Sequence, residues 1–324
     1  MRGDSDYLTE VNGGKVSVFT ATAVFGNTLA LWQTWRRPRN ASQIYIFTLG
    51  SGGGGGWGCD SQDQVTNRGG GGGGAGAASC SMLIDACRVP DLMYISVAMP
   101  GIGAGPNPPS NGAFNGENGA LSYVSVRPNS IVAADLMIRS ANGGAGGGTL
   151  NLSGGGGGNF GLPSIATATG AHGMGCGHWR TTVGANMTTG SDFDGPPPDV
   201  TYLGNTITTG GAGGGGIVAA TSETAGCAIA PIGRYPRLAG GLAGGGNGAD
   251  GYNLLFDARG QLLSRFFMTT GGTGGGGKIG NPAVGGYGGN GGYGLGGGGG
   301  GAGHINTTQS AGNGGGGLVI IIAR

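Results

Sequence analysis

Residues 44–58 read IYIFTLGSGGGGGWG, in which an apolar, strand-like segment runs directly into an unbroken run of glycines. The end of the chain reverses this order, because residues 312–324 read GNGGGGLVIIIAR. Short apolar runs rich in β-branched residues are typical of buried strands. We therefore expect these two segments to align and close the glycine-rich body between them, and they are candidate neighbours in one small sheet.

The composition is far from that of an ordinary globular protein. Of 324 residues, 85 are glycine and only 10% are charged, while Leu, Ile, Val and Phe together make up less than a fifth. This aliphatic content argues against a conventional core. The formal net charge of +1 provides no basic face for nucleic acid. Glycine-rich sequence is usually a flexible linker, but 9 Phe, 9 Tyr and 4 Trp argue against that interpretation.

The glycines are concentrated in runs separated by spacers of variable length. A glycine is disfavoured in an α-helix by about 1 kcal/mol relative to alanine, and it gains no side-chain packing in a strand. The remaining extended form is a left-handed threefold helix of the polyproline-II type, here called polyglycine II. One run cannot offset its ordering entropy, but packed runs can satisfy one another's backbone hydrogen bonds. The runs cover residues 52–56, 69–74, 143–148, 154–158, 210–216, 240–246, 271–277, 285–292, 296–301 and 314–317.

The segments between the runs predict short β strands. The expected fold class is therefore mostly irregular or all-β, a bundle of polyglycine-II helices flanked by short strands with almost no α-helix. We divide the chain into a segment for attachment or capping, residues 1–40, and a glycine-rich domain, residues 41–324. Trp32, Trp35, Arg36 and Arg37 are the candidate attachment residues. Strands are predicted in residues 15–24, two strands or a buried turn in 78–100, two strands around an Arg-Pro-Asn turn in 120–140, and a hairpin turning at 258–260 in 253–270.

The two strand–glycine junctions and the glycine runs between them resemble glycine-rich tail-fibre and adhesin proteins of tailed bacteriophages. These include the tip adhesins of T-even-type phages, whose glycine rows form a polyglycine-II sandwich. The resemblance covers residues 41–324 in style and does not extend to residues 1–40. It implies a virion protein, made in the host cytoplasm, that binds a host surface receptor through the loops between glycine rows. The receptor would be a glycan or an outer-membrane protein, the other partners would be tail-fibre, tail or capsid subunits, and the assembly a homotrimer or the tip of a trimeric fibre.

Three spacers combine aromatic, amide and proline residues, which is the composition of recognition loops. The strongest is residues 177–200; the others are 102–119 and 285–295. Their aromatic residues could instead cover the glycine slab. The candidate receptor-binding residues are His178, Trp179, Arg180, Asp192, Phe193, Asp194, Tyr287, Tyr293, Phe114 and Asn115.

Other kinds of site have little support in the sequence. HGMGCGHW, residues 172–179, offers two His and one Cys but no fourth metal ligand at a matching spacing. No GxGxxG follows a strand and opens a helix, and no catalytic constellation is recognisable. We expect no enzyme activity, cofactor, metal or nucleic acid. Five cysteines without a CxxC pair are expected to be reduced. The start MRGDSDYLTE lacks the apolar stretch of a signal peptide, and no apolar run approaches the roughly 20 residues that span a bilayer.

Three alternatives remain open from the sequence. A capsid, neck or head-fibre decoration protein of the same fold would use these surfaces to contact other virion subunits. An ice-binding protein would need a regular Thr or Ala face, which the sequence does not display. The mycobacterial glycine-rich surface family has similar GGAGG stretches, but it normally carries a long helical N-terminal domain that is absent here.

Overall fold

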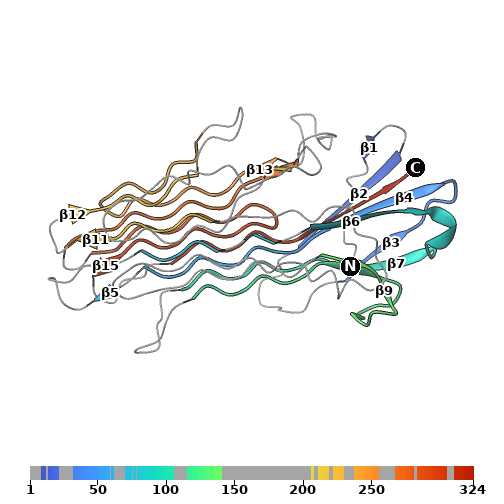
Figure 1. The fold of residues 1–324 in the computed structure, drawn as a ribbon, viewed down its shortest axis with the longest axis horizontal. Helices are drawn as coiled ribbons and strands as arrows, with labels where there is room; N and C mark the ends of the chain where they lie inside the picture. Colours follow the sequence, from blue (N-terminus) through green and yellow to red (C-terminus); the bar gives the residue numbers. More distant parts are fainter. Residues whose placement is uncertain are drawn as a thin grey trace.

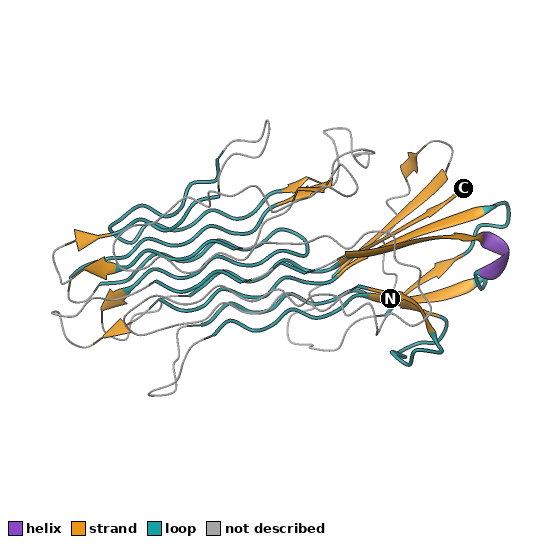
Figure 2. Ribbon diagram, in the orientation of Figure 1, coloured by secondary structure: helices purple, strands orange, loops and turns teal. Residues whose placement is uncertain are grey.

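The computed structural model describes residues 9–11, 14–21, 32–58, 60–61, 70–74, 76–77, 79–105, 115–140, 206–207, 211–218, 222–229, 237–254, 267–280, 283–304 and 310–324. Within these residues the elements are short strands and a single 3-10 turn, η1 (Ala86–Arg88). The expected class, irregular and β with almost no helix, is confirmed. Two β sheets occupy one end of the elongated molecule, and glycine-rich segments run along its length from there (Figures 1 and 2).

The larger sheet joins the beginning and the end of the described chain. Its five antiparallel strands follow the order β1 (Thr9–Val11), β2 (Gly14–Thr20), β16 (Leu318–Ala323), β4 (Gln43–Leu49) and β6 (Ser79–Asp85). Leu318 lies opposite Leu49, and Ala323 lies opposite Ile44. The predicted pairing of the two apolar segments is therefore confirmed. Strand β16 occupies the centre of the sheet and pairs along its whole length with β2 and β4.

The smaller sheet covers one face of the larger one. Its antiparallel order is β3 (Gln33–Arg36), β7 (Leu92–Ser96), β8 (Tyr123–Ser125) and β9 (Leu136–Arg139). The core between the sheets includes Ile46, Ile321, Met93, Val124 and Ile138, each at most 1% exposed. A second apolar cluster lies on the other face of the larger sheet, where Leu318 and Ile320 pack with Val16 and Leu295. Because both faces are covered, β16 reads as a continuous apolar run and not as an alternating one.

Shorter strands lie along the glycine-rich part. Strand β5 (Asp60–Ser61) pairs in parallel with β15 (Gly303–His304), and β11 (Ile217–Val218) pairs with β12 (Ser222–Glu223). These four strands lie at the end of the molecule opposite the two sheets (Figure 1). Strand β14 (Phe267–Thr269) pairs with β10 (Thr206–Ile207) and β13 (Asn253–Leu254).

The strand predictions agree with these elements. Strand β2 confirms the prediction for residues 15–24 over the described part, and β6 and β7 fill the segment 78–100. Strands β8 and β9 flank Arg127-Pro128-Asn129, where Asn129 has a φ of 53°. Strands β13 and β14 are antiparallel, as expected for the two arms of a hairpin, whereas its predicted turn at 258–260 lies outside the described residues. Strands β2 and β3 are hydrogen-bonded to strands from 41–324, so the described part of residues 1–40 is integrated into both sheets.

The glycine-rich segments, called glycine rows below, are joined by backbone hydrogen bonds that recur every third residue. In the row 270–278, the N–H groups of Gly272, Gly275 and Lys278 donate to the row 294–303, at 3.0 Å each. The intervening residues point elsewhere, because Thr273 and Gly276 donate to the row 246–252 and Gly274 and Gly277 to the row 224–227. Three successive residues thus address three neighbouring rows, and the rows 211–216, 238–244 and 285–293 donate back to this one. A row in this position has neighbours on every side.

These contacts stack the rows in three layers. The middle layer contains the rows with the most neighbours. The outer layer covers one side of the middle layer, and the third layer covers the other side. Every row runs along the long axis of the molecule (Figure 2). The outer layer consists of the rows 246–253, 285–293, 310–317 and 98–105, the middle layer of 238–244, 270–278, 294–303, 50–58 and 115–120, and the third layer of 224–229, 211–216 and 70–74 with 76–77.

Close approach explains why most positions in the rows are glycine. A Cβ on Gly299 would lie 1.9 Å from the carbonyl oxygen of Gly71, a backbone atom that cannot move aside. The next residue is different, since the nearest heavy atom to a Cβ on Gly300 would be 3.3 Å away. Ala212 and Ala302 are fully buried within the rows. A row therefore accepts a small side chain only at positions that point into a gap.

Buried serine hydroxyl groups form hydrogen bonds with backbone groups at the junction between the β strands and the glycine rows. The Ser122 hydroxyl donates to the Leu49 carbonyl oxygen at 2.7 Å and accepts from the Ala98 N–H at 3.0 Å. The Ser122 N–H in turn donates to the Ser140 hydroxyl oxygen at 3.0 Å. Ser51 accepts from the Ala120 N–H at 2.7 Å. At this junction the spacing of the backbone hydrogen bonds to one neighbour changes from every second residue to every third. The serine side chains provide hydrogen-bond partners for backbone groups that this change would leave unpaired.

Candidate functional site

The outer layer presents a regular row of side chains that accept hydrogen bonds from backbone N–H groups. In the row 285–293, residues 286, 289 and 292 donate to the middle layer, and residues 288 and 291 donate within the outer layer. The N–H groups of Tyr287, Asn290 and Tyr293 face the row 247–253, which itself donates to the carbonyl oxygens of Tyr287 and Asn290 through Gly248 and Gly251. In return, side-chain oxygens of that row, and not its backbone carbonyls, accept from these three N–H groups; the acceptors are Asn247, Asp250 and Asn253.

The acceptors match the donors in spacing. The Oδ1 atoms of Asn247, Asp250 and Asn253 accept at 3.1, 2.7 and 2.6 Å respectively, and each pair is separated by 40 residues. The pattern continues across the outer layer: the Asn290 Oδ1 accepts from the Asn313 N–H at 3.0 Å, and the Asn313 Oδ1 accepts from the Gly103 N–H at 2.9 Å. We call this surface the Asx ladder; it consists of Asn247, Asp250, Asn253, Tyr287, Asn290, Tyr293 and Asn313.

The Asx ladder is accessible and nearly uncharged. All its members are exposed except Tyr293, which is half-buried and packs against the cluster around Leu295. The Tyr287 side chain is 40% exposed, although aromatic residues are more often covered. Asp250 carries the ladder's one formal charge. Exposed aromatic and amide groups on a hydrogen-bonded backbone are the materials of a recognition surface.

Two of the predicted receptor-binding residues, Tyr287 and Tyr293, belong to the Asx ladder. Sequence reasoning missed its other members. The signal was present as two matching patterns with a period of three, NGADGYN at residues 247–253 and YGGNGGY at residues 287–293. Asn115 is exposed at the start of another glycine row, 115–120. The remaining candidates lie outside the described residues: Phe114, His178, Trp179, Arg180, Asp192, Phe193 and Asp194.

The predicted attachment residues lie in or beside strand β3. Trp35 is buried in the core, and its Nε1–H donates to the Ser17 hydroxyl oxygen at 3.2 Å, so it offers no surface for a partner. Trp32 is half-buried, with its ring edge-to-face against Tyr123 at a centroid distance of 5.5 Å. Arg36 is exposed. The attachment role remains a prediction.

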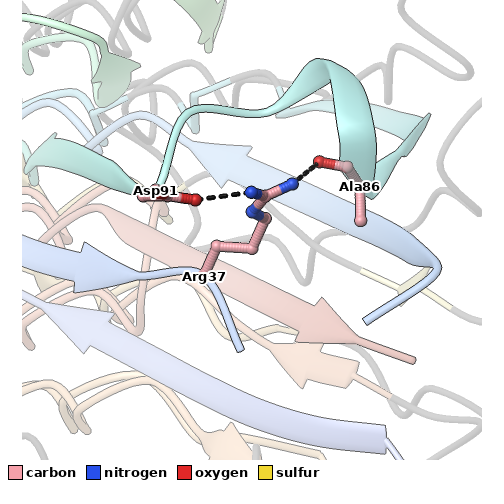
Figure 3. Close-up of polar contacts among 3 residues, drawn as sticks. All are labelled: Arg37, Ala86 and Asp91. Atoms are coloured by element: carbon pink, nitrogen blue, oxygen red, sulfur yellow. Dashed lines mark hydrogen bonds and ion pairs between the residues drawn. The ribbon is translucent and has the colours of Figure 1, made fainter. Parts of the chain in front are cut away.

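Arg37 links three segments at the sheet end of the molecule. Its guanidinium donates to the Asp91 carboxylate at 2.5 Å and to the Ala86 carbonyl oxygen, as Figure 3 shows. Its backbone N–H also donates to the Asp91 carbonyl oxygen at 3.0 Å. These bonds hold η1 and the start of β7 against the end of β3. The ion pair itself contributes little to stability because Asp91 is exposed to water.

The described residues contain no group of three or more His, Cys, Asp or Glu side chains placed to hold a metal ion. The predicted segment 172–179 lies outside them. Cys80, Cys87 and Cys227 do not form disulfide bonds, and Cys87 is exposed. Burial raises the pKa of the Tyr123 hydroxyl above its usual value, and a hydrogen bond with Ser96 opposes the rise.

Comparisons with family models and with curated proteins provide no evidence on the function of this chain. No protein-family model matches the chain, and no curated protein is significantly similar to it. No helix in the part of the chain that the structure describes has the length and apolar character needed to cross a bilayer.

Proposed function

We propose that the glycine rows are polyglycine-II helices and that this protein is a bacteriophage tail-fibre or tail-tip adhesin. The polyglycine-II assignment is supported by the three-residue repeat of the hydrogen bonds between rows, as seen at Gly272, Gly275 and Lys278. A threefold extended helix places every third N–H on the same side, whereas a strand places every second one there. Contacts from three successive residues to three different rows fit the threefold geometry and not the twofold one.

The architecture is suited to displaying loops at a distance from an attachment point. The β sheets at one end bury most of the aliphatic core, and the hydrogen-bonded layers of rows extend from them along the molecule. Loops between rows can vary in sequence without disturbing backbone contacts made by glycine. Together with the resemblance to glycine-rich phage adhesins, this arrangement favours non-covalent binding of a host surface receptor by a virion protein.

Two measurements on intact particles test this function. Antibody-gold labelling of the phage that encodes the chain should place the protein at the tail fibre or tail tip. Purified protein should compete with the phage for adsorption to host cells, and exchange of residues 177–200 for those of a relative should alter the host range. Labelling of the capsid or neck, with no competition, would contradict the proposal and favour a decoration protein.

A further inference from the structure

We propose that the Asx ladder binds an uncharged, extended glycan chain lying along the glycine rows. This inference rests on the proposed adhesin function and deepens it, because it names the receptor class and moves part of the contact from the loops to the side of the slab. It arises from the arrangement of Tyr287, Tyr293 and the amide side chains between and beside them.

Binding here would cost little conformational entropy. Asn247, Asp250 and Asn253 are held by hydrogen bonds to backbone N–H groups of the next row. Those N–H groups belong to a row that is itself bonded to the middle layer through Gly286, Gly289 and Gly292. A surface whose groups are already fixed loses less entropy when it binds a ligand.

The ladder retains hydrogen-bonding capacity that suits hydroxyl groups. Asn247 and Asn253 use the side-chain oxygen for the backbone, and each amide also carries two N–H donors. Asp250 engages one carboxylate oxygen with the Asn290 N–H and has a second acceptor oxygen. Sugar hydroxyls both donate and accept, so they can bind to both kinds of group. A single carboxylate and no cation among the ladder residues disfavour an anionic chain such as a sulfated or uronic-acid polymer.

The aromatic rings supply the apolar part of the contact. The C–H face of a pyranose ring can stack on a tyrosine ring, which has an apolar body and a polar tip. Tyr287 and Tyr293 are six residues apart, which corresponds to about 19 Å in a threefold extended row. A monosaccharide cannot reach both positions, whereas an extended oligosaccharide can. Because Tyr293 is half-buried against the core, Tyr287 should make the larger contribution.

The experiment uses the purified full-length chain on an array of immobilised neutral hexasaccharides of glucose, galactose, mannose and N-acetylglucosamine, with sulfated versions alongside. The wild type should bind at least one neutral chain and none of the sulfated forms more tightly. Tyr287→Ala should weaken that binding at least tenfold, while Tyr287→Phe should retain most of it. The matched control is Leu242→Ala, which removes a side chain that is 75% exposed and outside the ladder, and should bind as the wild type does.

Several outcomes would overturn the proposal. These are no binding to any neutral hexasaccharide, preferential binding to the sulfated ones, or equal binding by wild type and Tyr287→Ala. Thermal hysteresis that depends on Tyr287 would instead identify the ladder as an ice-binding face. Adsorption competition distinguishes failure of the glycan site from failure of the adhesin function. If Tyr287→Ala competes as well as the wild type, the adhesin function stands and the glycan site on the ladder fails. If neither competes, the adhesin function itself fails.

Discussion

Gly299 and Gly300 show how two adjacent residues of the same type can have different roles. Gly299 faces the carbonyl oxygen of Gly71, where a Cβ would lie at 1.9 Å, and Gly300 faces a space whose nearest atom would be 3.3 Å away. At some positions of a glycine row, the absence of a side chain permits direct contact with the backbone of the neighbouring row. At other positions no backbone atom of a neighbour lies so close. Composition alone predicted that the runs would pack, but it could not say which glycines touch, because that depends on how neighbouring rows are aligned.

We expect Gly299→Ala to lower the free energy of unfolding by about 3 kcal/mol or to prevent folding, because the new Cβ would clash with a backbone carbonyl oxygen, which cannot move aside as a flexible side chain can. Gly300→Ala should change it by less than about 1 kcal/mol, since only small shifts are needed and alanine restricts the unfolded chain. Denaturant titration of the two variants measures both values. Equal destabilisation by the two would contradict the alignment of the rows.

Tyr123 should make stability sensitive to alkaline pH. Burial disfavours its charged form and raises its pKa above about 10, the value expected in the unfolded chain. Its contribution is therefore fully present below pH 10 and is lost as the pH rises through the folded-state pKa. Unfolding free energies of the wild type should fall more steeply than those of Tyr123→Phe as the pH rises above about 10. Parallel curves for the two proteins would show that this hydroxyl does not titrate differently on folding.

At the scale of elements, β4 and β16 could be predicted because each is a mainly apolar run bordered by glycine, which follows β4 and precedes β16. Their register and two-sided burial, in contrast, depend on tertiary contacts with the second sheet and with Leu295. The Asx ladder is the opposite case. Its patterns at residues 247–253 and 287–293 were visible in the sequence, but which row accepts from which depends on a contact between residues 40 apart. The interpretation of residues 1–40 as a separate segment also missed their long-range pairing with β16 and β7.

Adjacent residues of β16 should differ in their effect on the sheet. Ile321 is fully buried between the sheets, so Ile321→Ala should cost about 3–4 kcal/mol through lost contacts and a cavity. Ile322 is half-buried on the opposite face, and Ile322→Ala should cost about 1 kcal/mol. Thermal and denaturant unfolding provide the comparison. The register would be wrong by one residue if the order of the two effects were reversed.

At the scale of the whole molecule, stability should be shared among the rows. The central rows 270–278 and 294–303 each donate to and accept from several others, so neither can leave without breaking bonds in its neighbours. We expect the amide protons of Gly272, Gly275 and Gly299 to exchange slowly and at one common rate, set by global unfolding. Hydrogen exchange followed by NMR or mass spectrometry tests this. Exchange at the rate of an unstructured peptide would contradict the proposal that the rows form a polyglycine-II platform.

The position of β16 also has a consequence for biosynthesis. It is the last strand in chain order, yet it fills the slot between β2 and β4, two of the earliest. During translation those two partners must wait, with their inner edges unoccupied, until residues 318–323 leave the ribosome. The larger sheet therefore cannot close before residues 318–323 have been made, and until then the inner edges of β2 and β4 are open to edge-to-edge aggregation.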